Sequence, residues 1–89
     1  MVRRQLISER NYLTDKLTEI ALELKRLLSE GDRLRAELDA LSESETERRD
    51  TIRRRRAFIG RRCEELKMER HKAIADRDEF IKQLWADTP

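Results

Sequence analysis

An apolar stripe with a seven-residue repeat runs through the first half of this 89-residue chain. Alternating steps of three and four residues from Leu6 to Leu41 meet an apolar side chain everywhere except at Arg10 and Gly31. Such a stripe follows one face of an α-helix and is stable in water only when another helix covers it. The pattern therefore predicts a long helix in a coiled coil.

A second and less apolar stripe follows in the other half. Its positions hold Ile52, Arg56, Ile59, Cys63, Leu66, Arg70, Ala73, Arg77, Phe80 and Leu84. Arginines on a coiled-coil seam reduce stability unless they are paired or reach solvent, and they can select a register or a partner. We expect one helical domain over residues 1–89, with helices at about 3–41 and 45–86 and a polar, acidic link at about 42–46.

The link is the expected turn. Residues 42–47, Ser-Glu-Ser-Glu-Thr-Glu, contain no apolar side chain, and the pairs Ser42 with Glu45 and Ser44 with Glu47 both match a capping box. We expect the first helix to continue through Gly31 because the stripe keeps its phase there and an interior glycine costs only about 1 kcal/mol.

Two helices of nearly equal length with a short polar link are suited to an antiparallel hairpin. We therefore predict an all-α fold, an antiparallel two-helix coiled-coil hairpin that dimerises into a four-helix bundle. One alternative is a long continuous helix in a parallel or antiparallel dimer, and another is three shorter helices broken at Gly31 and Gly60. Dimerisation is expected because a hairpin buries only one narrow stripe per helix, whereas the apolar face is wider near residues 27–28 and 81–85.

The residues expected to form the interface are the apolar members of the two stripes. They are Leu6, Leu13, Leu17, Ile20, Leu24, Leu27, Leu34, Leu38, Leu41, Ile52, Ile59, Cys63, Leu66, Ala73, Phe80 and Leu84. Four further residues are candidates for partner contacts: the aromatic Tyr12 and Trp85 and the seam arginines Arg70 and Arg77.

Charge is segregated along the chain. Residues 1–47 carry 8 basic and 11 acidic side chains, whereas residues 48–89 carry 13 and 8. Arginine forks bind phosphates at two points, so the basic segment 48–62 is a candidate nucleic-acid surface. Its candidate phosphate-binding residues are Arg49, Arg53, Arg54, Arg56, Arg61 and Arg62. The competing interpretation is that these arginines pair with acids such as Glu30 and Glu37 across the hairpin.

The remaining chemistry of the sequence is sparse. One cysteine, Cys63, and one histidine, His71, are too few for a four-ligand zinc site within one chain. The sequence shows no nucleophile beside a base, no paired carboxylates in an apolar pocket and no glycine-rich phosphate loop. We expect no catalytic residue, metal, cofactor or small-molecule substrate. The cysteine usage favours the cytoplasm, and no apolar run is long enough to cross a membrane.

These observations favour a non-enzymatic coiled-coil module for protein–protein interaction, acting as a small adaptor, assembly or inhibitor subunit. The expected partner is a second copy or a larger protein. The alternative function is a small nucleic-acid-binding helical bundle that uses the arginine-rich first half of the second helix.

Overall fold

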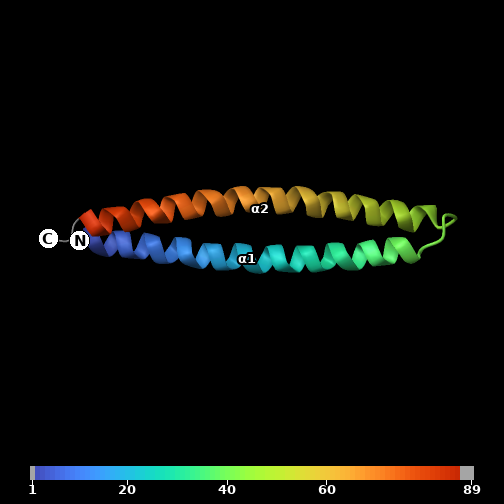
Figure 1. Cartoon of the computed structure of the whole chain (residues 1–89), viewed down its shortest axis with the longest axis horizontal. Helices are drawn as coiled ribbons and strands as arrows, with labels where there is room; N and C mark the ends of the chain where they lie inside the picture. Colours follow the sequence, from blue (N-terminus) through green and yellow to red (C-terminus); the bar gives the residue numbers. More distant parts are fainter. Residues whose placement is uncertain (1, 87–89) are drawn as a thin grey trace.

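The computed structural model describes residues 2–86, which form two long helices and a short connection. Helix α1 spans Val2–Ala40 and helix α2 spans Thr46–Ala86. They lie side by side and antiparallel, with the connection at one end and the start of α1 beside the end of α2 at the other (Figure 1). The particle measures 70 × 15 × 15 Å. The predicted helical hairpin is confirmed, whereas the continuous helix and the three-helix alternative are wrong.

The helix bounds differ slightly from the expected ones. α1 ends at Ala40, not at 41, and α2 begins at Thr46, not at 45. Gly31 and Gly60 lie inside the helices, and neither has a positive φ. A Cβ atom built on Gly31 would lie 3.9 Å from Cγ2 of Ile59, so the isoleucine packs against the bare backbone of α1.

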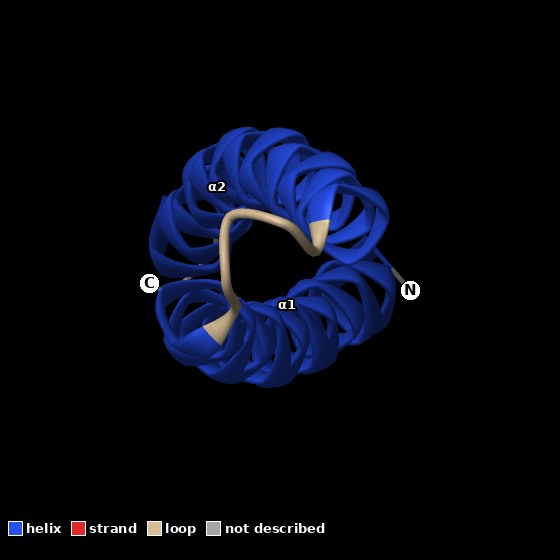
Figure 2. Ribbon diagram, turned by 90° about the vertical axis from the view of Figure 1, so that its right-hand side faces the viewer, coloured by secondary structure: helices blue, strands red, loops and turns tan. Residues whose placement is uncertain are grey.

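The connection is a tight turn closed by Ser42 and Glu45. The N–H of Glu45 donates to the carbonyl of Ser42 over 3.2 Å, and the N–H of Ser42 donates to Oε2 of Glu45 over 3.0 Å. The expected contact between Ser42 and Glu45 therefore forms. Both residues precede α2, so the contact closes the turn and does not lie in the first turn of the helix. The Ser44 and Ser42 hydroxyls are hydrogen-bonded over 2.9 Å, and Ser44 forms no hydrogen bond with Glu47. Seen along the long axis, this turn bridges the two helices (Figure 2).

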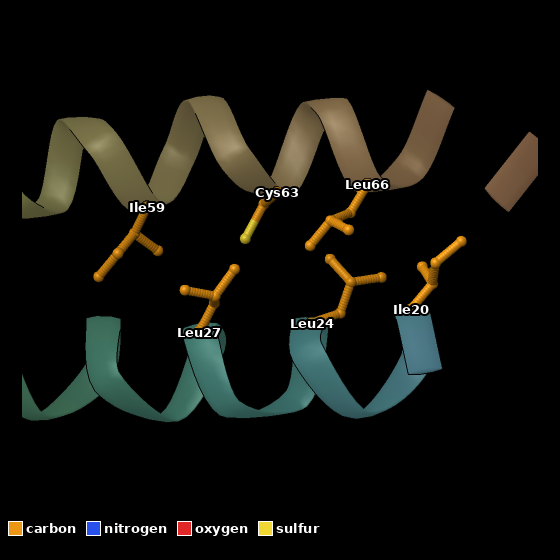
Figure 3. Close-up of a cluster of buried hydrophobic side chains, with 6 residues drawn as sticks. All are labelled: Ile20, Leu24, Leu27, Ile59, Cys63 and Leu66. Carbon is orange, nitrogen blue, oxygen red and sulfur yellow. The ribbon is translucent and has the colours of Figure 1, made fainter. Parts of the chain in front are cut away.

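The core is a single seam between α1 and α2. Figure 3 shows its central part, where Leu27 and Cys63 point toward each other and Leu24 faces Leu66. The buried seam residues are Leu6, Leu13, Ile20, Leu24, Leu27, Ile52, Ile59, Cys63, Leu66, Ala73 and Leu84. The other expected interface residues are half-buried: Leu17, Leu34, Leu38, Leu41 and Phe80.

The arginines of the second stripe lie differently. Arg56 and Arg70 are exposed, whereas Arg77 is half-buried and its Nε atom is shielded from solvent without a hydrogen-bond partner. Because Arg56 and Arg70 leave the seam for solvent, α2 covers α1 less completely than a leucine-lined helix would.

Candidate interaction surfaces

The two long edges of the hairpin differ in chemistry. On one, which we name the ladder edge, three glutamates of α1 face three arginines of α2. Arg48 Nη2 lies 2.6 Å from Glu37 Oε1, Arg55 Nε lies 2.7 Å from Glu30 Oε1, and Arg62 Nε lies 3.1 Å from Glu23 Oε1. Both sets recur every seven residues, which places them on one flank of each helix.

The central pair of the ladder edge is the most regular. Arg55 donates to both carboxylate oxygens of Glu30, and its guanidinium also lies over the Phe58 ring, 4.9 Å from the centroid. The hydrogen bonds from Arg55 hold the pKa of Glu30 below its usual value and raise the pKa of Arg55. Both groups therefore remain charged over a wider pH range than free side chains do.

Arg62 is the centre of a small acidic cluster. It donates to Glu23 from Nε and Nη2, and its Nη1 lies 3.2 Å from Glu65 and 3.6 Å from Glu69. Hydrogen bonds to Glu23 and then to Glu65 raise its pKa. This guanidinium is already satisfied within the chain, which leaves it little capacity for a phosphate.

Arg49 has a structural role at the turn. Its Nη1 donates to the carbonyl oxygens of Leu38, over 3.4 Å, and of Leu41, over 3.2 Å. The last carbonyls of a helix have no partner within it, and a basic side chain suits the negative end of the helix dipole. Arg49 therefore caps the end of α1.

The candidate phosphate-binding arginines do not form one surface. Besides Arg49 and Arg62, Arg53 lies 3.6 Å from Asp50, and Arg54 donates to the Asp50 carbonyl over 3.4 Å. Arg56 and Arg61 have no ion-pair partner among residues 2–86. Arg54 and Arg61 are seven residues apart on the outer face of α2, whereas Arg56 borders the seam. The cluster is thus divided between internal contacts and solvent.

Toward the chain ends the ladder edge becomes a groove that we name the acidic groove. Its apolar lining includes Tyr12, Leu13, Ala73 and Phe80. The charged residues around it are Glu9, Lys16, Glu69, Lys72, Asp76 and Glu79. Acids outnumber bases here, and the Tyr12 candidate lies exposed beside them.

The opposite edge, which we name the open edge, carries apolar residues at the same seven-residue interval. On α1 these are Ile7, Ala21 and Leu28, and on α2 they are Ile74 and Ile81. Leu28 is 59% exposed and Trp85 is 74% exposed. Trp85 lines a pocket at the chain ends with Arg3, Ile7, Arg10, Ile81 and Leu84. Ile7 and Ile81 are half-buried, whereas Leu28, Ile74 and Trp85 are exposed, so the hairpin covers the open edge only in part.

Midway along the open edge, two adjoining hollows form what we name the basic groove. Its floor contains Leu24, Leu28 and Cys63. Its charged residues are Lys25, Asp32, Arg35, Arg56, Glu64, Lys67 and Arg70. The Arg70 candidate is among them, whereas Arg77 lines neither hollow.

Sequence reasoning missed several of these residues. Glu23 was not expected to pair with the arginine cluster, although its seven-residue spacing from Glu30 and Glu37 mirrors the spacing of the arginines. Lys25 and Arg35 were not singled out either. The sequence feature that could identify Lys25 and Arg35 is their position beside the apolar residues of the open edge. This position is apparent only when the two helices are aligned with each other.

No family model, curated protein or solved structure matches this chain. Within the described part of the chain, no group of three or more His, Cys, Asp or Glu side chains is arranged to hold a metal ion. Neither helix, over the residues described, is long and apolar enough to cross a membrane.

Proposed function

We propose that this hairpin is a non-enzymatic module for protein–protein interaction, which acts as a small adaptor, assembly or inhibitor subunit through the open edge. The observation that carries the proposal is the exposure of Leu28 within an apolar row that the hairpin covers only in part. We place this role in the cytoplasm, where an unpaired cysteine such as Cys63 stays reduced.

The contrast between the edges supports this function. A two-stranded coiled coil needs apolar residues only at the seam, and its flanks are normally charged, as the ladder edge is. A helix that contacts two neighbours has a wider apolar face that includes one flank, as the open edge does. The partner is a second copy, giving a four-helix bundle, or a helix of a larger protein.

Site-specific photocrosslinking tests this function. A photoreactive amino acid replaces Leu28 on the open edge or, as the control, Leu22, which is similarly exposed at 63% but lies on the outer face. We expect adducts of discrete mass from position 28 that disappear when Ile74→Glu is added, and none from position 22. Equal adducts from both positions, or none from either, would contradict the proposal. Sedimentation equilibrium of the isolated chain then separates a second copy from another protein.

A second candidate function is nucleic-acid binding, and one observation favours it. Arg54 and Arg61 are seven residues apart on the outer face of α2 and have no acid partner within residues 2–86. A phosphate contact predicts that log affinity for duplex DNA falls with log salt by about 0.9 per phosphate. Arg54→Glu with Arg61→Glu should abolish such binding. Measured affinity that is unchanged in this variant excludes the second candidate.

A further inference from the structure

The basic groove combines an apolar floor with an excess of positive charge at its rim. Leu24 and Cys63 belong to the buried cluster, and the exposed Leu28 extends this apolar surface outward. Five basic and two acidic side chains surround it. One base and one acid of this rim pair with each other, because Lys67 Nζ lies 3.3 Å from Glu64 Oε1.

The four remaining basic residues form no ion pair within residues 2–86. They are Lys25, Arg35, Arg56 and Arg70, and against them stands Asp32 alone. On the ladder edge, by contrast, every cross-helix arginine has its own glutamate. Guanidinium groups beside an apolar surface pair best with carboxylates, which they bind at two points.

We propose that the basic groove binds one amphipathic helix of another protein, whose apolar stripe is flanked by glutamates or aspartates. This inference rests on the proposed interaction role and specifies the chemistry of the partner. The groove runs along α1 from Ala21 to Arg35, about 21 Å at the helical rise of 1.5 Å per residue, which matches about four turns of a docked helix.

A second copy fits this groove less well. Two chains joined open edge to open edge bring their unpaired cations together, and like charges at an interface disfavour association. The acidic groove of a second copy has the complementary sign, but that contact is heterologous, so it generates rings or open filaments of molecules and not the isologous dimer of a four-helix bundle. Charge complementarity therefore favours an acidic helix from a different protein.

Two synthetic helical peptides test the proposal. Both carry the same leucine stripe and a fluorescein label, and the leucines are flanked by glutamates in one peptide and by lysines in the other. The full chain is titrated into each while anisotropy is followed at low and at physiological salt. We expect the glutamate peptide to bind at least tenfold tighter than the lysine peptide, with an affinity that falls as salt rises.

Matched variants locate the binding. Arg56→Glu with Arg70→Glu should weaken binding of the glutamate peptide at least tenfold, whereas Arg54→Glu with Arg61→Glu, the same change of charge on the outer face, should alter it less than twofold. Leu28→Ser should weaken binding and Leu22→Ser should not. These side chains are exposed, so circular dichroism should show each variant folded.

Three results would overturn the proposal. Equal affinity for both peptides would mean that charge does not select the partner. An equal loss of affinity in the groove variant and the outer-face variant would mean that the positive charge attracts the peptide non-specifically. An isolated chain that sediments as a dimer and becomes monomeric with Leu28→Glu assigns the groove to a second copy, which leaves the interaction role intact. The interaction role itself fails only if position 28 also gives no specific crosslink.

Discussion

Arg55 of α2 and Glu30 of α1 join the two helices at two points, with Nε donating to Oε1 over 2.7 Å and Nη2 donating to Oε2 over 2.9 Å. The pair is the middle rung of a ladder with the same seven-residue interval on both helices. A slip of one interval would place Glu69 beside Glu23 or, in the other direction, Arg62 beside Lys16. Like charges therefore disfavour both neighbouring registers.

The pH dependence of stability should reveal the contribution of the ionised Glu30 carboxylate to the stability of the hairpin. Its pKa is lowered by Arg55 from an ordinary value of 4.5, so the folded state binds this proton less readily than the unfolded chain. Its contribution to stability is complete above the ordinary pKa and is lost as pH falls through the lowered one. Glu30→Gln should therefore show a smaller fall of Tm than the parent chain between pH 6 and pH 3, as followed by circular dichroism.

The matched control for this titration is Glu43→Gln in the turn, where the carboxylate is exposed and has no ion pair within residues 2–86. Its melting curves should follow those of the parent chain. Identical pH profiles for the parent and Glu30→Gln would show that Arg55 does not act on this carboxylate. The effect should be small, because Arg55 is exposed, Glu30 is only half-buried, and ion pairs in contact with solvent contribute little.

Exchanging the charges of the central rung should preserve the hairpin. Arg55→Glu alone places two acids together, and Glu30→Arg alone places two bases together, so each should lower Tm. The double variant restores opposite charges at the same positions and should recover most of the loss. Effects of the single variants that simply add in the double variant would mean that the two residues do not interact. Thermal melting at low and high salt measures the coupling.

The sequence predicts the hairpin because its two apolar stripes have nearly equal lengths and a polar segment separates them. Continuity through Gly31 also follows from the unbroken phase of the stripe. The partner of each arginine does not follow from the sequence, because it depends on the register of α1 against α2. Moving α2 by one residue exchanges Glu23 for another neighbour of Arg62.

The role of Arg49 depends on the turn even more strongly. Its guanidinium reaches Leu38 and Leu41 only because Ser42 and Glu45 fold the chain back within a few residues. A repeat pattern contains no information about this geometry, so Arg49 is indistinguishable in the sequence from the exposed arginines that follow it. The open edge was partly foreseeable, because the stripe broadens near Leu28, whereas its basic rim depends on both helices.

Removing the cap on α1 should loosen the turn end of the hairpin. Arg49→Ala leaves the Leu41 carbonyl to water and the Leu38 carbonyl with only its contact to the Leu41 N–H over 3.3 Å, and should cost about 1 kcal/mol, the usual net value of a hydrogen bond. Amide exchange should accelerate at Leu41, whose N–H bonds the Glu37 carbonyl over 3.1 Å, and should remain slow at mid-helix positions. Arg54→Ala, exposed on the same helix, is the control. A stability loss of the same size in both variants would deny Arg49 a capping role.

The two interior glycines should respond differently to large side chains. Alanine at either position should stabilise the hairpin by about 0.5–1 kcal/mol, because glycine is costly within a helix. A methyl group on Gly31 meets Ile59 at an ordinary contact distance of 3.9 Å, and one on Gly60 has no neighbour within 4 Å.

Leucine should separate them. Gly31→Leu forces Ile59 from its place in the seam and should destabilise the chain by about 1–3 kcal/mol in urea unfolding, the usual cost of overpacking. Gly60→Leu should not destabilise the chain, because the new side chain extends into the basic groove. This variant should instead block binding of the glutamate peptide. If Gly31→Leu proves as stable as Gly60→Leu, then Ile59 does not pack on the α1 backbone and the register drawn from the three ion pairs is wrong.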